Sequence, residues 1–154
     1  ARQVKVITAA EAAALIKTAI PLQQGFRSIR YPRSSGQSCR RKIPATGEPR
    51  DITYVYCGSQ GNKDGRGAEH FAHEGLLKRY IAGHWATVPA LQKMALENKM
   101  EAYNVSQGAL CHLFRDIAAQ DPAASKGRSG YILSTPENGG GKVNDVTKED
   151  IIEL

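Results

Sequence analysis

The sequence lacks long apolar runs and has few cysteines for its 154 residues. No stretch is long or apolar enough to cross a membrane, and the N-terminus carries no hydrophobic signal-peptide core. The three cysteines, Cys39, Cys57 and Cys111, are odd in number and unrelated in spacing. This pattern argues against a disulfide framework and favours reduced thiols, so we expect a cytoplasmic protein with no membrane partner.

Acidic residues are absent from one segment, 18–44, and this absence explains the net charge. The chain has 21 Lys and Arg against 15 Asp and Glu, a formal charge of +6. All of the excess comes from the basic residues of this segment, which are Arg27, Arg30, Arg33, Arg40, Arg41 and Lys42. The remainder of the chain is neutral, so the basic balance does not by itself indicate a nucleic-acid partner.

The overall composition is ordinary for a globular protein, with 41% hydrophobic and 23% charged residues. The length allows one domain with a real core. The chain is organised around residues 52–57, a run of β-branched, aromatic and cysteine side chains that predicts a buried strand. A glycine-rich loop follows at 58–67, and the apolar spacing of 68–81 predicts a helix.

Strand, glycine loop and helix together are half of a βαβ unit, so we predict an α/β fold with a mostly parallel sheet flanked by helices. Ligands of such sheets bind beyond the carboxyl ends of the strands, where this loop lies. Its spacing fits neither a P-loop nor the dinucleotide fingerprint, so it is a weak nucleotide signal.

Further elements are expected on both sides of this unit. Thr8 and Glu11 form a capping box before a helix at 9–17. Segment 18–44 shows neither helical nor strand periodicity. The remaining expected elements are strands at 4–7, 100–105 and 131–133, helices at 90–99 and 109–119, and a last helix beginning near Thr147.

Three blocks of the sequence resemble the amino-terminal part of the family I coenzyme A transferases, and most closely the single-chain propionate (acetate) CoA-transferases. The middle block, 46–119, is the most specific. It contains Gly-Ser-Gln-Gly at 58–61, Gly-Arg-Gly-Ala-Glu-His-Phe-Ala-His-Glu-Gly at 65–75, Gly-His-Trp at 83–85 and Tyr-Asn-Val-Ser-Gln-Gly at 103–108. The other two blocks are 4–13 and 138–150. The resemblance covers about two-thirds of the chain and implies that 1–154 is a partial amino-terminal domain of such an enzyme.

Two patches, 18–44 and about 122–137, depart from the family pattern. We interpret both as read in a shifted coding frame, because alternative frames can encode family-like residues there. On this hypothesis a core strand and a ligand loop are missing, and the charge of +6 is accidental.

The resemblance implies transfer of coenzyme A between short-chain carboxylic acids through a glutamyl-CoA thioester, a form of covalent catalysis. It places the nucleophilic glutamate in the carboxyl-terminal half of the enzyme, so the chain alone is expected to be inactive. No permanently bound cofactor is implied; the coenzyme A thioester is a substrate. The expected partners are acyl-CoA, a short-chain carboxylate, the carboxyl-terminal half and further copies of the full-length enzyme.

Gln107 and Gly108 follow a predicted strand and precede a predicted helix, where backbone and amide donors can face a ligand. The resemblance implies an active-site role for Gln107, with Gly108 beside it, and Asn104, Gly83 and His84 border the same expected crevice. Four further candidates for backbone contacts to substrate or CoA come from the glycine loop, namely Gly58, Ser59, Gln60 and Gly61. A turn with a helix cap, and a tight connection after a strand, are the structural alternatives for these two groups.

Other reactive side chains are assigned structural roles. His70 and His73 have i, i+3 spacing on the predicted helix, but no third ligand is evident, so we predict no metal site. Cys57 and Cys111 are interpreted as small core residues. Glu137 stands in a Glu-Asn-Gly sequence similar to that around the nucleophile of two-subunit family members. Its surroundings match the amino-terminal half instead, so we assign no catalytic residue.

Two alternatives belong to other classes. Segment 18–44 could be a basic arm of a small RNA-binding module, but its aromatic residues are limited to Phe26 and Tyr31 and it has no RNA-binding motif. We therefore do not favour nucleic acid as a partner. The chain could also be an unstable gene remnant without function, which cooperative thermal unfolding would contradict.

Overall fold

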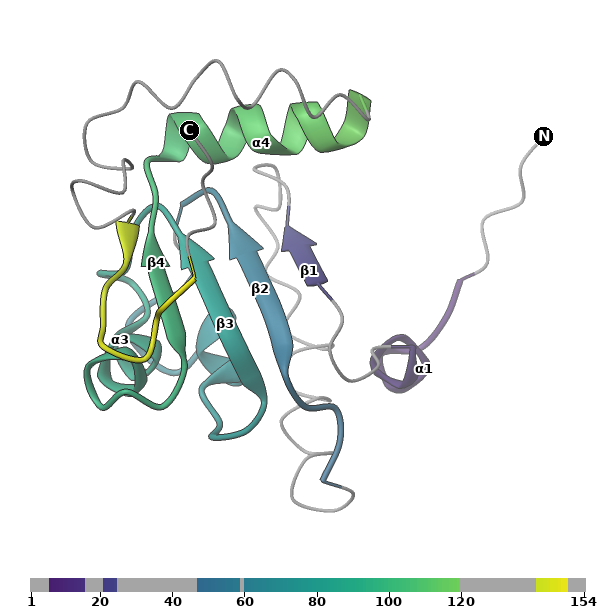
Figure 1. Ribbon diagram of the computed structural model, residues 1–154. Coiled ribbons are helices and arrows are strands. Elements are labelled where there is room, and N and C mark those ends of the chain that lie inside the picture. Colours follow the sequence, from purple (N-terminus) through teal and green to yellow (C-terminus); the bar gives the residue numbers. More distant parts are fainter. Residues whose placement is uncertain (1–5, 16–20, 25–46, 59, 120–140, 150–154) are drawn as a thin grey trace.

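Four parallel strands form a sheet in the order β1-β2-β3-β4 (Figure 1). The computed structural model describes residues 6–15, 21–24, 47–58, 60–119 and 141–149. The strands are β1 (Pro21–Gln24), β2 (Ile52–Tyr56), β3 (Leu77–Ala82) and β4 (Glu101–Asn104). The expected α/β class with a parallel sheet is confirmed.

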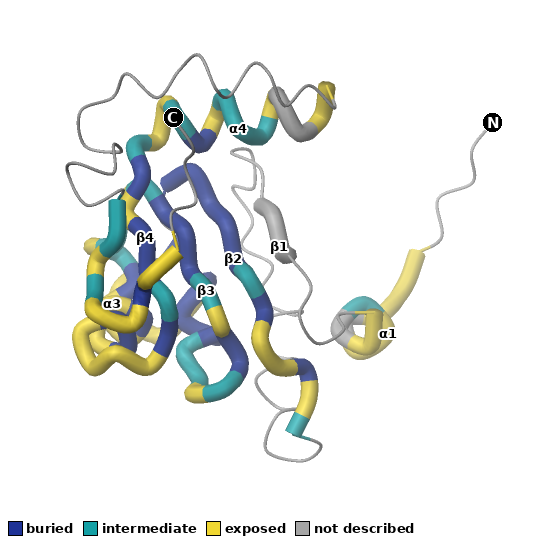
Figure 2. The backbone as a smooth tube through the Cα atoms, viewed as in Figure 1, coloured by how far each residue is buried: buried dark blue, intermediate teal, exposed yellow. Residues whose placement is uncertain are grey.

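Strand β2 has the burial that its composition predicts. Ile52, Tyr54, Val55 and Tyr56 are all buried, and β2 pairs with β1 on one side and β3 on the other. Side chains on both faces of this strand are covered, and Figure 2 shows the burial extending through β3 and β4. A near-continuous apolar run is typical of such a position.

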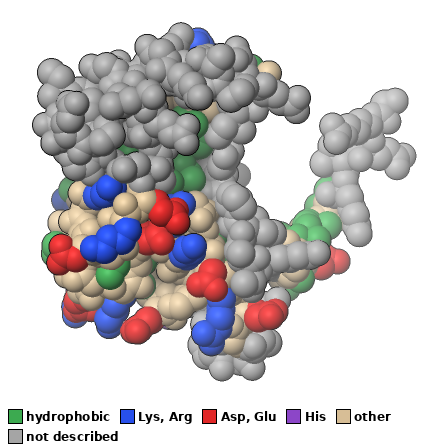
Figure 3. All heavy atoms as spheres, in the orientation of Figure 1, with side chains coloured by type: hydrophobic (Ala, Val, Ile, Leu, Met, Phe, Trp, Pro, Cys, Tyr) green, Lys and Arg blue, Asp and Glu red, His purple; other side chains and the backbone are tan. Residues whose placement is uncertain are grey.

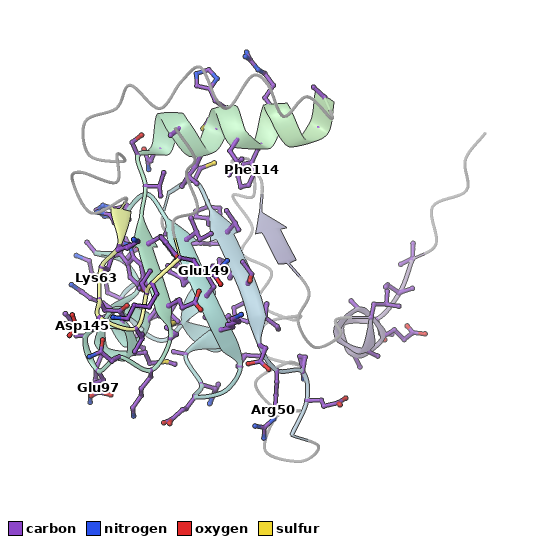
Figure 4. The ribbon with its side chains drawn as sticks, viewed as in Figure 1. Arg50, Lys63, Glu97, Phe114, Asp145 and Glu149 are labelled. Carbon is purple, nitrogen blue, oxygen red and sulfur yellow. The ribbon has the colours of Figure 1, made fainter. Side chains whose placement is uncertain are left out.

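Two apolar clusters cover the two faces of the sheet. On one face, Tyr54 and Tyr80 stack with ring centroids 5.5 Å apart. They pack with the 3-10 helix η1 (Ala68–Phe71) and with helix α3 (Pro89–Leu96), whose Leu91 is fully buried. On the other face, helix α4 (Gln107–Ala119) packs Leu110 and Phe114 against the sheet (Figure 4). The predicted helices at 90–99 and 109–119 and the strand at 100–105 are confirmed within a few residues.

The helix predicted at 68–81 is wrong. Only Ala68–Phe71 is helical, as a single 3-10 turn, and Leu77–Ala82 is strand β3. Gly75 has a φ of +81°, a left-handed conformation that ends any helix at that point. The apolar residues after it satisfy helical spacing, but pairing with β2 and β4 makes them a buried strand.

The expectation that residues 18–44 contain no strand is also wrong. Pro21–Gln24 forms β1 and pairs in parallel with β2, with Pro21 opposite Thr53. Pairing of this kind depends on backbone hydrogen bonds and needs no alternation of side chains, and proline is tolerated at the first position of a strand. A strand is therefore present where the frame-shift hypothesis expected one to be missing. Residues 18–20 and 25–44 lie outside the described residues.

The capping box at Thr8 is confirmed. The backbone N–H of Glu11 donates to Thr8 Oγ1 (3.2 Å), and the N–H of Thr8 donates to the Glu11 carboxylate (2.7 Å). These bonds begin helix α1 (Ala9–Ala14), which stands beside β1 and apart from the rest of the sheet (Figure 1). The strand expected at 4–7 does not form at Val6 and Ile7, which are exposed coil.

Residues 141–149, called the strap below, run along β4 and complete its outer edge. The N–H of Val143 donates to Ala102 O (2.9 Å), and the N–H of Ala102 donates to Thr147 Oγ1 (2.8 Å). Asn144 Nδ2 donates to Ala95 O (2.7 Å) and to Met100 O (2.9 Å). Thr147 is thus a buried anchor of the strap. The helix expected after it lies almost wholly beyond the described residues, as does the expected strand at 131–133.

The described surface has a mixed charge. Figure 3 shows acidic and basic side chains interspersed over the face that carries α3 and the strap. No helix in the described ranges combines the length and apolar character that a membrane span requires.

Candidate functional site

The carboxyl ends of β2, β3 and β4 bring three of the candidate residues together. Gly58 follows β2, Gly83 follows β3, and Gln107 begins α4 just after β4. A Cβ atom placed on Gly58 would lie 3.0 Å from Gln107 Nε2, and one on Gly83 would lie 2.7 Å from Gln107 Cγ. The Gln107 side chain therefore lies directly over both glycines.

Gly83 is required by close backbone packing. A Cβ atom there would lie 3.1 Å from Val105 O and closer still to Cys57 O, and neither carbonyl can move without shifting a strand end. His84 is held at the same place, because its N–H donates to Gly58 O (3.2 Å). The absence of a side chain at Gly83 lets three chain segments meet beneath Gln107.

The other candidates at this edge are open to solvent. Asn104, Gly108, His84 and Gln107 itself are exposed. Ser106 precedes α4, and its carbonyl oxygen accepts the N–H of Leu110 (3.1 Å). Amide and backbone N–H donors of this kind, at a helix N-terminus beyond parallel strands, suit a ligand that bears oxygen atoms.

Gln60 and Gly61 lie on the inner side of the glycine loop instead. Gln60 is 2% exposed, and its Oε1 accepts the Tyr54 hydroxyl (2.8 Å). A Cβ atom on Gly61 would lie 2.7 Å from Val88 Cγ1 and closer still to the Thr87 carbonyl oxygen. Both residues are buried against the protein. Ser59 lies outside the described residues.

Glu69 is a buried residue that sequence reasoning overlooked. It is 6% exposed, and its carboxylate accepts two backbone N–H groups, from Gly65 (2.7 Å) and from Ala90 (3.0 Å). The second of these belongs to the first turn of α3, where a negative charge is stabilised by the helix dipole. Glu69 thus ties the glycine loop to α3. The only sign of this role in the sequence was an acidic residue placed between residues that were expected to be buried.

The histidines and cysteines differ in part from expectation. His70 is buried on η1 and His73 lies beyond its end, so the prediction that both stand on one helix is wrong. Cys57 is buried, as predicted, and burial raises its pKa to about 12. Cys111 is exposed, which corrects its assignment to the core. The described residues contain no group of three or more His, Cys, Asp or Glu that could hold a metal ion.

A charged network at Arg79 fixes the strap across the middle of the sheet. Arg79 Nε donates to Glu101 (2.5 Å), Nη2 donates to Glu149, and the guanidinium carbon lies 5.6 Å from the centre of the Tyr103 ring. Burial opposes the charge on Arg79, but the two carboxylates outweigh it and raise its pKa. Arg79 in turn lowers the pKa of Glu149, which lies in front of β3 (Figure 4). This network is below the candidate site and supports the strands that carry it.

The fold and this edge define a class, namely an α/β protein that presents glycines and a helix N-terminus at the carboxyl ends of parallel strands. No protein-family model matches the chain. Acetate CoA-transferase YdiF of Escherichia coli K12 is 36% identical over 113 residues, which are 73% of this chain and 21% of that protein. Caffeate CoA-transferase of Acetobacterium woodii is 29% identical over 151 residues, which are 97% of this chain and 29% of that protein.

Solved structures agree with these relatives. The apoenzyme of acyl-CoA transferase YdiF from E. coli O157:H7 has a TM-score of 0.81 and 30% identity, covering 96% of this chain and 29% of that one. Its thioester complex with CoA has a TM-score of 0.80 with the same coverage. Over 73% to 97% of its own length, the chain is therefore similar to coenzyme A transferases. It spans between a fifth and three tenths of the length of the relatives it matches.

Proposed function

We propose that this chain is part of an enzyme that transfers coenzyme A between short-chain carboxylic acids such as acetate and propionate. The observation that carries the proposal is the 36% identity to an acetate CoA-transferase over 73% of the chain. The agreement in fold with a related acyl-CoA transferase over 96% of the chain supports it.

In this proposal Gln107 is the principal binding residue of the chain. Its exposed amide lies over Gly58 and Gly83 at the carboxyl edge of the sheet, where it can donate to an oxygen of the acyl group. Gly58, Gly83, His84, Asn104 and Gly108 line the same edge. Gln60 and Gly61 support the loop from inside, so we assign them no direct contact with substrate. The contribution of Ser59 stays a prediction.

The nucleophile is proposed to be a glutamate of the carboxyl-terminal half of the parent enzyme. Its carboxylate attacks the acyl-CoA carbonyl and displaces the CoA thiolate, which gives an acyl-glutamyl anhydride. The thiolate then attacks the glutamyl carbonyl, which releases the first carboxylate and leaves a glutamyl-CoA thioester. The second carboxylate attacks this thioester, and the same two steps in reverse place coenzyme A on the second acyl group and free the glutamate. The role of this chain is to bind and orient the thioester and acyl oxygens. By itself the chain is therefore expected to be inactive, and the complete parent is expected to be a homo-oligomer.

The test begins with the coding DNA through both departing patches and downstream of residue 154. We expect family-like residues in an alternative frame at 18–44 and 122–137, and a glutamate-bearing transferase half downstream. An uninterrupted single frame would overturn the frame-shift hypothesis, and a downstream sequence unrelated to transferases would overturn the proposed parent.

The activity is tested on the frame-corrected full-length protein. Acetyl-CoA and propionate are supplied, and propionyl-CoA is measured by mass spectrometry. We expect transfer, and a loss of about 10²-fold in kcat for Gln107→Ala if the amide stabilises developing charge. The matched control is Gln92→Ala, an exposed glutamine of α3, which should leave kcat unchanged. No transfer, or equal activity of the two variants, would contradict the proposal.

A further inference from the structure

Two cysteines lie on neighbouring elements beside the candidate site. Cys57 is the residue before Gly58, and it is 1% exposed. Cys111 is exposed on α4, one helical turn after Gln107 and therefore on the same side of the helix. Burial raises the pKa of the Cys57 thiol, and the nearby Cys111 side chain raises it further. Two cysteines 54 positions apart in the sequence are thus neighbours in the fold.

Independent contacts fix this proximity. A Cβ atom on Gly83 would approach both Cys57 O and Gln107 Cγ, so the end of β2 and the first turn of α4 border the same point. Cys57 also packs in one apolar cluster with Leu110, the residue before Cys111. The start of α4 is therefore held against the end of β2 by packing.

The two thiols differ in access. Cys111 is open to a dissolved oxidant, whereas Cys57 is covered and its raised pKa of about 12 keeps it protonated at neutral pH. An external reagent therefore meets Cys111 first. Cys57 is placed to react only with what becomes attached to Cys111.

We propose that Cys57 and Cys111 are a redox modification site that low-molecular-weight disulfides such as oxidised glutathione convert into an intramolecular disulfide. The Cys111 thiolate attacks one glutathione sulfur, forms a mixed disulfide and releases a glutathione thiolate. Cys57 then loses its proton and attacks the Cys111 sulfur, which releases the second glutathione. The net reaction oxidises two protein thiols to one disulfide and reduces one oxidised glutathione to two glutathione molecules.

The disulfide would bond the end of β2 to the first turn of α4. Gly58 and Gln107 lie at these two places, so oxidation would fix the spacing between the strand end and the side chain above it. Activity in the parent enzyme is not needed to detect this modification, so its test is independent of the proposed function.

The test uses the 154-residue chain carrying Cys39→Ser, so that only the proposed pair titrates. After incubation with oxidised glutathione, we expect intact mass spectrometry to show the loss of two hydrogens, and peptide mapping to show Cys57 linked to Cys111. The Cys57→Ala variant should stop at one attached glutathione, and the Cys111→Ser variant should remain unmodified. Circular dichroism of each variant verifies that the fold is retained.

The pH dependence provides a second readout. Because Cys57 must lose its proton, the conversion of the mixed disulfide to the internal disulfide should accelerate about tenfold per pH unit between pH 7 and 9. The proposal is overturned if the chain with both cysteines stops at the same glutathione adduct as Cys57→Ala. It is also overturned if the cysteines link only between molecules.

Discussion

Replacing Glu69 by glutamine tests whether a buried carboxylate holds the glycine loop against α3. The side chain keeps its size and loses its charge. The carboxylate accepts one N–H from Gly65 and one from Ala90. Glutamine has a single carbonyl oxygen, so one of these N–H groups would face an NH₂ group that cannot accept it.

The expected cost follows from these contacts. A hydrogen bond to a buried charged group contributes about 1.5–3 kcal/mol, and a charge at a helix N-terminus contributes about 0.3–1 kcal/mol. We therefore expect Glu69→Gln to lower the free energy of unfolding by about 2–4 kcal/mol. Urea denaturation followed by circular dichroism measures this value. Hydrogen exchange of the Gly65 amide should also become faster.

Glu74→Gln is the matched control. The Glu74 side chain is 73% exposed, and its partner Lys99 lies at 3.3 Å on the surface, so its urea midpoint should remain close to that of the unsubstituted chain. Equal midpoints for Glu69→Gln and Glu74→Gln would refute the role assigned to Glu69. Unchanged exchange at Gly65 would refute the bond to the loop.

Three further substitutions test the strand ends and the strap. Gly83→Ala should destabilise the fold by about 1–3 kcal/mol in urea denaturation, because the new methyl group meets backbone carbonyl oxygens that cannot yield. Thr147→Val should cost about 1–3 kcal/mol in the same assay, because it leaves the buried N–H of Ala102 without its acceptor. Glu149→Gln should change the pH dependence of the thermal midpoint. Arg79 holds the pKa of Glu149 below 4.5, so the ion pair stabilises the fold above that pH and its contribution is lost as the pH falls through the lowered value. The difference between this variant and the unsubstituted chain should therefore close on acidification.

Control substitutions accompany each of these variants. Gly65→Ala introduces a methyl group into open space at a φ of +70°, so it reports backbone strain without a clash and should cost less than Gly83→Ala. Thr53→Val, on a half-buried strand position, should be nearly neutral. Asp145→Asn, an exposed change within the strap, should retain the acid-dependent midpoint. A reversed order in any of these pairs contradicts the corresponding contact.

The local hydrophobic pattern was sufficient to predict those elements whose period fits only one kind of secondary structure. Residues 52–56 are too short and too apolar for an exposed helix, and the stripe through Leu110 and Phe114 fits only a helix. Segment 68–81 was different, because Leu77, Tyr80 and Ile81 satisfy a helix stripe and a buried strand equally well. Hydrogen bonding to neighbours that are distant in sequence decided the outcome, and a local period does not contain that information.

The same division applies to the candidate site. Parallel strands end at one edge, so Gly58 and Gln107, which follow predicted strands, could be placed together from the sequence. Gly83 was placed there by the family resemblance alone, because the segment before it was predicted to be a helix. Which side of the glycine loop faces the protein could not be read from spacing. Gln60 points inward because it accepts the Tyr54 hydroxyl, and Glu69 is retained inside because two amides need its oxygens. The inward positions of both side chains depend on hydrogen-bond partners in the folded structure, and the identity of a single residue does not reveal those partners.

The strap also determines how the molecule can meet other chains. Both backbone polar groups of Ala102 are engaged, one by Val143 and one by Thr147. An intruding peptide would have to break these bonds before it could add to β4 in the manner of a growing fibril. Removal of residues 141–149 should therefore convert a protected flank into a template for self-association, and light scattering of the shortened chain would reveal it.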